Sequence, residues 1–397
     1  MTSQVPNIPG EFVNDTFALK EKVASLLHLK KYKFPGAQPI SFGAKQLEEI
    51  EREDFFVAEK SDGIRCLALL TVNNRREPEV YLFDRKSNFH VVRNFRFPIP
   101  GDPSFQKCLK NTIIDGEFVL DKEADGTVSI QVLFYSTQLK FLLFDCLCIE
   151  EKVLVSRDLM KRLGHLKTEI IRPHQAMVKN NPSLAKRLPF IVEFKEQQFT
   201  HHLDIVFNEI IPNLKHGNDG LIFTSANAPY VMGTCNKMLK WKPLNENSVD
   251  FKVRLIFPGG RLPGVKDYTA TPRIDLLVWQ GGNNYEFFAE LGITNEEWEK
   301  QFKDKPKYMD GKIIECNYDP QLQQELNLKS PWRFMRYRDD KPDGNHQSTV
   351  DNVLRSIQDA VSKEELIARM PRIKEASNRR KEREVYDDRD KKRRRQN

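Results

Sequence analysis

The segment Glu59-Lys60-Ser61-Asp62-Gly63-Ile64-Arg65 places a nucleophile and a second cation close together in the chain. The preceding run Phe55–Ala58 predicts a short buried strand, and Asp-Gly is typical of a turn. A lysine at the end of such a strand would be partly desolvated and close to Arg65, and both effects disfavour its ammonium form. Lys60 is therefore a candidate amine nucleophile, and Arg65 could hold a phosphate or a ribose hydroxyl. Taken alone, the motif is better explained as an exposed loop lysine.

Five further clusters contain residues suited to a nucleotide and its phosphates. They are Tyr81–Arg85 with Arg85 at a strand end, Ile113–Glu117 with Glu117, Phe141–Asp145 with Phe144, Asp219–Phe223 with Asp219, and Leu239–Pro243 with Lys240 and Lys242. In an extended chain, Lys240 and Lys242 would point to one face, whereas Phe144 and Asp145 would point to opposite faces. Each cluster alone is explained by a turn, a core ring or solvated charge, so only their combination indicates a site.

The hydrophobic pattern changes along the chain, and its two parts predict different sets of elements that position these residues. From about Gln46 to Pro243 short strands mix with helices; the strands are 81–84, 112–120, 131–134, 141–149 and 221–223, and the helices are 156–166 and 202–211. From Ser248 the pattern is rich in strands, at 249–257, 274–279, 285–291, 312–317 and 332–338, with a helix at 295–301. Five strands with a helix between the third and fourth is the order of an OB-fold barrel. Amphipathic helices are predicted at 348–357 and 363–370, the second closed by Pro371.

The net charge of +7 over 397 residues is concentrated at the C-terminus. Residues 374–397 contain eleven Lys/Arg and six Asp/Glu, so they carry +5 and the rest of the chain carries +2. Any basic groove in the body must therefore be local. The tail is predicted to be disordered or a frayed helix, and its Lys391–Arg395 run is similar to a nuclear import signal, although solvated charge is the commoner meaning of such runs.

Several classes of protein are excluded by the remaining composition. No stretch approaches ~18 uninterrupted apolar residues, so no membrane span is expected. The N-terminus lacks the basic and apolar regions of a signal peptide. The six cysteines form no C-x-x-C pair, which argues against a zinc site and suits a reducing compartment.

In this order, the clusters closely resemble the motifs of the covalent lysine nucleotidyltransferase superfamily, which includes mRNA capping guanylyltransferases and ATP-dependent DNA and RNA ligases. Two segments, Phe34–Phe42 and Trp332–Lys341, are similar to signatures of cellular capping enzymes, and the fungal type matches best. The resemblance extends from about Pro6 to about Pro371.

The resemblance implies an α+β fold with a nucleotidyltransferase domain of the DNA-ligase (ATP-grasp-like) type and a C-terminal OB-fold barrel. The expected boundaries are 1–245 for the nucleotidyltransferase domain and 246–345 for the OB-fold. Residues 346–373 are expected to form C-terminal helices that pack back on the first domain, and 374–397 a disordered basic tail.

The resemblance also implies a two-step reaction. Lys60 would attack the α-phosphate of GTP and release pyrophosphate, and the GMP on Lys60 would pass to the 5′-diphosphate end of nascent RNA to give the GpppN cap. For the nucleoside, the resemblance implies that Arg65 and Glu117 hold the ribose hydroxyls, Phe144 stacks on the purine face and Lys195 contacts the guanine edge. For the phosphates, it implies Lys240 and Lys242 at the α-phosphate, Arg85 at the outer phosphates and Asp219 on a Mg²⁺ or Mn²⁺ ion. Arg338 and Lys341, oriented by Asp250, would bind the β- and γ-phosphates. For Asp250 a surface ion pair is an equally good reading.

Partners follow from the same resemblance. The roughly 50 residues before the Lys60 strand contain no cysteine, so we expect no Cys-phosphatase loop there. The RNA 5′-triphosphatase activity is therefore expected to come from a separate subunit. The phosphorylated C-terminal repeats of RNA polymerase II and a nuclear location are expected by analogy.

Two rival functions remain. A polynucleotide ligase would carry adenylate on Lys60, but the Phe34–Phe42 and Trp332–Lys341 segments weigh against it. A non-catalytic scaffold would have no need of the full set of charged residues.

Overall fold

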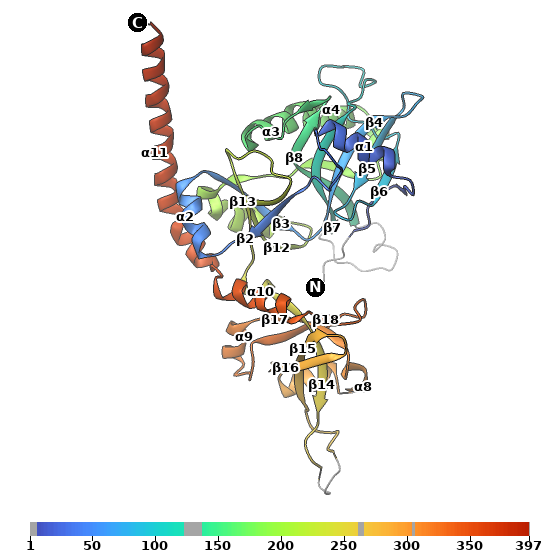
Figure 1. The fold of residues 1–397 in the computed structure, drawn as a ribbon, viewed down its shortest axis with the longest axis vertical. Coiled ribbons are helices and arrows are strands. Elements are labelled where there is room, and N and C mark those ends of the chain that lie inside the picture. Colours follow the sequence, from blue (N-terminus) through green and yellow to red (C-terminus); the bar gives the residue numbers. More distant parts are fainter. Residues whose placement is uncertain (1–5, 123–136, 261–265, 304–305, 397) are drawn as a thin grey trace. The chain divides into compact units, whose positions relative to one another are not determined.

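The computed structural model describes residues 6–122, 137–260, 266–303 and 306–396 (Figure 1). They form two compact units, one containing the chain up to Trp241 and again from Glu364 onward, and the other Lys242–Lys363. The strand predicted at 131–134 lies outside the described residues. Among the helices of the described part, none is long and apolar enough to cross a membrane.

The larger sheet of the first unit has the strand order β1-β6-β5-β4-β7-β8-β10. Its strands are β1 (Glu11–Phe12), β4 (Ile64–Val72), β5 (Pro78–Phe83), β6 (Phe89–Arg93), β7 (Thr112–Lys122), β8 (Thr137–Ile149) and β10 (Ile191–Phe194), and β9 (Lys152–Val153) pairs with β8. The predicted strands at 81–84, 112–120 and 141–149 lie in β5, β7 and β8. Their apolar side chains are buried, which makes this sheet the centre of the unit's core.

A smaller sheet has the order β11-β3-β12-β13-β2. Its strands are β2 (Ala37–Ser41), β3 (Phe55–Ser61), β11 (Gln198–Phe199), β12 (Asn218–Ser225) and β13 (Gly233–Trp241). Along β3, buried and half-buried residues alternate strictly, as they do in a strand with two different environments on its faces. Phe55 and Val57 face the core, and Ala58 and Lys60 face the other side.

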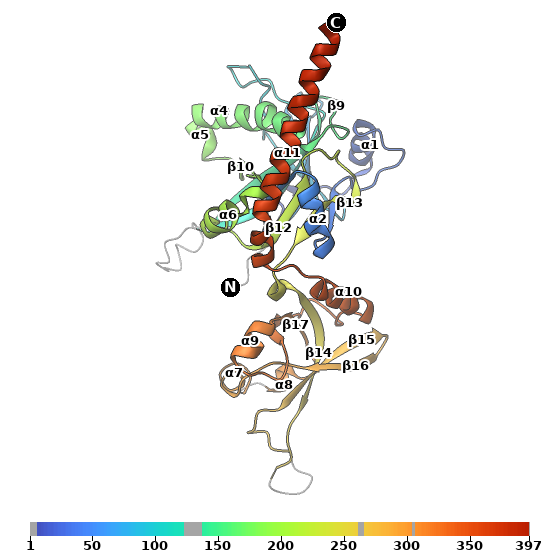
Figure 2. The same cartoon turned by 90° about the vertical axis from the view of Figure 1, so that its left-hand side faces the viewer.

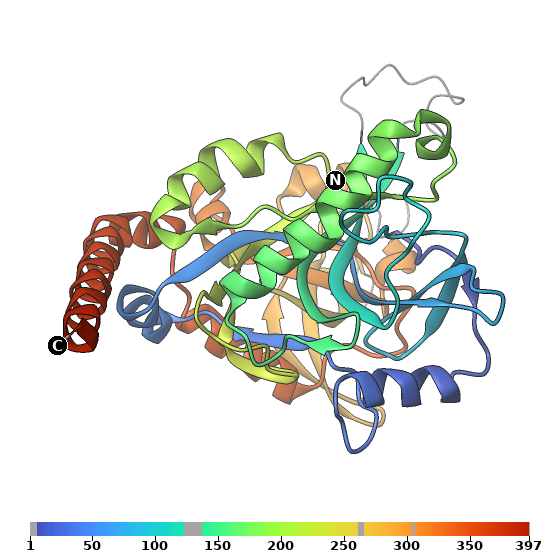
Figure 3. The ribbon, with the colours of Figure 1, turned by 90° about the horizontal axis from the view of Figure 1, so that it is seen from above.

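Helices cover both sheets of the first unit (Figure 3). They are α1 (Phe17–Leu26), α2 (Ala44–Arg52), α3 (Leu159–His165), α4 (Arg172–Asn180), α5 (Pro182–Ala185) and α6 (Leu203–Ile205). A π-helical stretch, Leu166–Ile171, joins α3 to α4, so the helix predicted at 156–166 begins later and continues further than expected. The helix predicted at 202–211 is broken into short α, π and 3₁₀ segments.

The second unit contains a sheet of order β16-β15-β14-β17-β18. Its strands are β14 (Ser248–Ile256), β15 (Arg273–Gly281), β16 (Asn284–Glu290), β17 (Ile313–Tyr318) and β18 (Trp332–Tyr337), each overlapping its predicted strand. The helices between strands are α7 (Asn295–Gln301), α8 (Pro306–Met309) and α9 (Pro320–Glu325). The Gly292 N–H donates to the Trp332 carbonyl at 2.8 Å, which brings the end of β16 to the start of β18. This strand order, with α7 between the third and fourth strands, is that of an OB-fold.

The C-terminal helices differ in part from the prediction. Helix α10 (Gln347–Gln358) buries Val350 among the barrel residues and belongs to the second unit, whereas the residues from Glu364 onward belong to the first unit. Helix α11 (Lys363–Gln396) runs through the tail, which was predicted to be disordered or a frayed helix (Figures 1 and 2). Pro371 lies inside α11 and does not end it, although its nitrogen cannot donate a hydrogen bond to the carbonyl of Ile367.

Contacts with α2 explain why α11 persists. The Arg380 guanidinium lies 2.6 Å from Asp54 and 2.7 Å from the Glu51 carbonyl, and Arg369 lies 2.8 Å from Glu51. Ser377 is also buried. Arg380 and Ser377, in the part of the chain that was predicted to be disordered or a frayed helix, therefore contribute to a packed face.

Candidate active site

A pocket lies between the two sheets of the first unit. The larger sheet and the segments around it contribute Arg65, Glu117, Phe144, Asp145, Leu159, Lys195 and Gln197, and the smaller sheet contributes Pro39, Ala58, Glu59, Lys60, Ser61, Ile222, Thr224 and Met238. Five residues singled out from the sequence line this pocket together: Lys60, Arg65, Glu117, Phe144 and Lys195.

Lys60 lies near the end of β3, and its Nζ atom is 2.6 Å from Oδ1 of Asp219. The pairing of β12 with β3 shifts register between Asn218 and Leu221, so Asp219 lies in an irregular stretch beside the lysine. Gly220 within this stretch has φ +143°, which favours glycine. The nearest charged group to Lys60 is thus a carboxylate, and not the second cation predicted from the sequence.

The strand register places Lys240 on the face that carries Lys60. Ala58 of β3 is paired with Ile222 of β12, and Ile222 is paired with Lys240 of β13. Side chains directly opposite one another in a sheet share a face, and Ala58 and Lys60 share a face within β3. Lys242 follows the end of β13 and is the first residue of the second unit, so the single extended segment predicted for the two lysines ends between them.

Arg65 is held from behind by an acid. Its Nε and Nη2 atoms donate to Asp115 at 3.0 and 2.6 Å, and Nη1 donates to the Ala37 carbonyl. Tyr230 donates its hydroxyl to the same Asp115 at 2.6 Å and accepts from the Ala37 N–H at 3.0 Å. Burial alone would lower the pKa of Arg65, but the buried Asp115 carboxylate outweighs it and raises that pKa. The guanidinium is therefore fixed in one orientation, with its carbon 5.4 Å from the ring centre of Phe144.

Phe144 is the extra residue of a β-bulge. Asp115 of β7 pairs with Asp145, and the next residue, Gly116, pairs with Leu143, which leaves Phe144 unpaired. The bulge interrupts the regular alternation of side chains at this point, and Phe144 and Asp145 both line the pocket. That the two side chains point to opposite faces stays a prediction.

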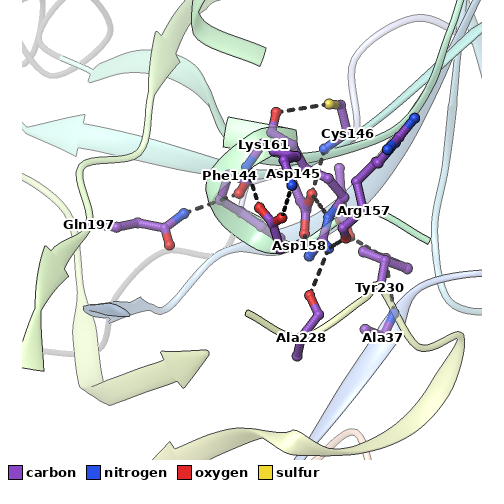
Figure 4. Close-up of polar contacts among 12 residues, drawn as sticks. Ala37, Phe144, Asp145, Cys146, Arg157, Asp158, Lys161, Gln197, Ala228 and Tyr230 are labelled. Atoms are coloured by element: carbon purple, nitrogen blue, oxygen red, sulfur yellow. Dashed lines mark hydrogen bonds and ion pairs between the residues drawn. The ribbon is translucent and has the colours of Figure 1, made fainter. Parts of the chain in front are cut away.

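The contacts around the bulge hold it in place (Figure 4). Gln197 donates to the Phe144 carbonyl at 3.1 Å. Asp145 is bound by Arg162 at 2.8 and 2.9 Å, with both side chains buried. Burial raises the pKa of Asp145, although Arg162 acts in the opposite direction.

Lys195 is buried at the inner end of the pocket. Its Nζ atom lies 2.7 Å from Ser61 Oγ, 3.3 Å from Glu59 and 3.5 Å from Glu117. Burial would lower the pKa of Lys195, but the two carboxylates raise it above its ordinary value. The ammonium group thus links Glu117 to two residues that sequence reasoning did not select, Glu59 and Ser61. The sequence did contain a signal for these two residues, because they lie on either side of Lys60 in a strand whose side chains alternate between two faces.

Arg85 stands apart from the pocket. It lies in the turn after β5, is exposed, and donates to Gln38 at 2.9 Å. It is absent from the pocket lining, although Gln38 is adjacent to the lining residue Pro39.

In the second unit, Asp250 forms ion pairs with both Arg338 and Lys341. Arg338 Nη1 lies 3.1 Å from both carboxylate oxygens of Asp250, and Lys341 also bonds this carboxylate. Arg338 further contacts Asp340 at 2.8 Å, and mainly this contact raises its pKa. Asp250 is only 4% exposed, so the reading as a surface ion pair is excluded.

Comparisons with known proteins agree over nearly the whole chain. The model of the mRNA capping enzyme catalytic domain matches residues 5–244, and that of the mRNA capping enzyme C-terminal domain matches 246–367. The mRNA-capping enzyme subunit alpha of Schizosaccharomyces pombe is 42% identical over 374 residues, which cover 93% of this chain and 88% of that protein. The Yarrowia lipolytica protein of the same name is 39% identical and covers 94% and 92%. A solved mycobacterial DNA ligase D complexed with ATP and MES aligns with a TM-score of 0.38 and 15% identity, covering 78% of this chain and 96% of that chain.

Proposed function

The chain belongs to the mRNA capping enzyme family and is an mRNA guanylyltransferase, and from this premise we propose how its residues transfer GMP from GTP to the end of an RNA. The observation that supports the assignment most is the position of Lys60, whose amine lies in a pocket with an aromatic ring, a carboxylate and a buried cation. In the first step the Lys60 nitrogen bonds to the α-phosphorus and pyrophosphate leaves. In the second step the diphosphate end of RNA displaces the lysine.

The purine binds between the two sheets. Phe144 offers a ring from the larger sheet, and Ile222 and Met238 offer apolar surface from the smaller one. Glu117, whose side chain is 17% exposed, accepts hydrogen bonds from the ribose hydroxyls. Arg65 mainly holds this side of the pocket in place, because its contacts with Asp115 leave few of its N–H groups for a ligand.

Lys195 reads the guanine edge. An ammonium group donates to the O6 acceptor of guanine and finds no acceptor at the amino group of adenine. The alternative, that Lys195 only neutralises Glu59 and Glu117, predicts no discrimination between the two bases.

The phosphates are bound by cations and by a divalent metal. Lys240 shares the face of Lys60 and neutralises the α-phosphate as charge develops, with Lys242 as a second cation and Arg85 at the outer phosphates. The described residues contain no cluster of three or more metal-binding side chains. Asp219 nevertheless fits Mg²⁺ or Mn²⁺, because Mg²⁺ at such sites is held by one or two carboxylates together with substrate phosphates. When bound, the ion neutralises charge on the phosphates.

The second unit supplies Arg338 and Lys341 to the β- and γ-phosphates, and Asp250 orients both. In the family, this barrel closes over the nucleotide and reopens for RNA. Closure excludes water from the site, which protects the phosphoamide.

The remaining partners are proposed from the family alone. They are a separate RNA 5′-triphosphatase subunit and the phosphorylated C-terminal repeats of RNA polymerase II. A nuclear location follows from action on nascent pre-mRNA.

Labelling with α-³²P-GTP and Mg²⁺, followed by denaturing electrophoresis, tests this function. The wild-type chain retains GMP after denaturation, whereas a ligase would retain AMP from ATP and a scaffold would retain neither. Lys60→Arg should abolish the adduct, because a guanidinium stays protonated and cannot act as the amine nucleophile. A persistent adduct in Lys60→Arg, mapped to another residue, would refute the role of Lys60.

A further inference from the structure

His216 lies behind the pocket, between two buried carboxylates. Its Nδ1 atom is 2.8 Å from Asp121 of β7, and its Nε2 atom is 3.7 Å from Glu59 and 3.5 Å from Ser61 Oγ, both of β3. The imidazole side chain is only 8% exposed. An imidazole with a carboxylate at each nitrogen is stabilised in its protonated form, since both nitrogens then donate.

Glu59 is shared between His216 and Lys195. Ser61 accepts from Lys195 at 2.7 Å and donates to Glu59 at 3.1 Å, and Lys195 and His216 both lie near the same oxygen of Glu59, at 3.3 and 3.7 Å. While His216 is charged, it satisfies part of the negative charge of Glu59. When His216 loses its proton, Lys195 is left as the principal counter-charge of Glu59 and is drawn inward, away from Glu117 and the pocket.

We propose that His216 is a positioning residue for guanine recognition, which acts through Glu59 and Ser61 to hold the Lys195 ammonium at the pocket. The proposal deepens the function argued above and rests on the role of Lys195 in reading guanine.

The direction of the pH dependence follows from the groups around His216. Asp121 and Glu59 face its two nitrogens, Lys195 lies beyond Glu59, and Lys140 lies 2.9 Å from the far oxygen of Asp121. Burial would lower the pKa of His216, but its interactions with Glu59 and Asp121 raise that pKa above the ordinary value. His216 therefore keeps its proton to a higher pH than a free imidazole does, and guanine discrimination should fall as the pH rises through its raised pKa.

The experiment measures a ratio that cancels other titrations. The rate of lysine–nucleotide formation per unit concentration is determined for GTP and for 2-aminopurine riboside 5′-triphosphate, which lacks O6, from about pH 6 to about pH 8. Titration of the phosphates affects both substrates equally, and this range lies below the pH at which guanine loses its N1 proton. In the wild type, the ratio of GTP to analogue should fall about tenfold over this range, as expected for loss of one charge-assisted hydrogen bond.

Three variants separate the outcomes. His216→Gln should give a low ratio that does not change with pH, and Asp121→Asn should move the fall to lower pH because it removes a group that raises the pKa of His216. His174→Gln is the control, since His174 is also a buried imidazole but packs against Phe95 and Phe97 outside the pocket. It should lower stability and leave the ratio unchanged.

The contrary results are distinct. A His216→Gln protein that keeps the wild-type ratio at every pH would overturn the proposal and leave His216 a structural residue. If Lys195→Ala also keeps the wild-type ratio, the assignment of Lys195 to guanine is wrong. If Lys195→Ala loses the ratio and His216→Gln keeps it, only the role of His216 fails.

Discussion

Each residue of the site is held by a partner distant in the chain. Lys60 contacts Asp219, Arg65 contacts Asp115, and Lys195 bridges Glu59 and Glu117. Buried or half-buried charges of this kind persist only where an opposite charge compensates for the water that they lose. The chemistry of the pocket therefore depends on a second layer of carboxylates as much as on the residues that touch the nucleotide.

Buried His174 should make the protein sensitive to mild acid. Burial among aromatic rings lowers its pKa to about 4, from 6.5 in the unfolded chain. Between these values the unfolded state binds more protons, so stability should fall as the pH drops from 6.5 to 4, by up to about 3 kcal/mol.

Urea unfolding of the wild type and of His174→Gln at pH 7.5 and pH 4.5 measures this contribution. The variant should be less stable at pH 7.5 but should lose less on acidification, because glutamine does not titrate. An equal loss of stability in both proteins would show that His174 is not the group responsible.

At the scale of elements, helix α11 stabilises the first unit through Arg380. Its guanidinium contacts Asp54 and the Glu51 carbonyl, next to α2. Arg380→Ala should lower the free energy of unfolding of this unit by about 1–2 kcal/mol, as for other charge-assisted hydrogen bonds. Arg379→Ala is the control, because the Arg379 side chain is 68% exposed and pairs only within α11. Thermal unfolding that does not distinguish the two variants would contradict a structural role for this part of the helix.

The elements that the sequence predicts well are those specified by local pattern. Helix α7 has the predicted bounds, Asn295–Gln301, because Thr294 and Glu297 form a capping box beside an apolar residue, Trp298. The barrel strands follow from period-2 alternation and turn residues in the same way.

The features that the sequence did not predict depend on contacts between residues far apart in the chain. The composition of the tail indicated disorder or a frayed helix, and it contains no signal of the contact between Arg380 and Asp54, a residue far away in the chain. The bulge at Phe144 is a property of the pairing of β7 with β8, so the sequence of β8 alone gives no signal of it. The partner of Lys60 was predicted as a neighbouring cation because Arg65 is near in sequence, whereas pairing of β3 with β12 brings in Asp219.

At the scale of the whole molecule, we propose that the first unit acts in both steps of the reaction and the second unit only in the first step. The first unit contains Lys60 and the nucleotide pocket, and the second contains Arg338 and Lys341 around Asp250. Pyrophosphate departs only in the first step, and these cations are proposed to bind the phosphates that become pyrophosphate. Arg338→Ala or Lys341→Ala should therefore slow formation of the lysine–GMP intermediate by roughly 10²–10³-fold, as for loss of one preorganised electrostatic donor. Transfer of GMP from the preformed intermediate to RNA should change little.

Single-turnover kinetics of each step decide the matter, with the second step started from the fraction of each variant that can be loaded with GMP. Arg254→Ala serves as the control, because Arg254 is an exposed cation of the same barrel that pairs with Asp275 and not with Asp250. It should leave both steps near the wild-type rates. The phosphates that form pyrophosphate have left once GMP is on Lys60. An equal loss of rate in both steps for Arg338→Ala would therefore mean that this arginine maintains the fold of the barrel through Asp250. A loss confined to the first step would place it on the leaving group.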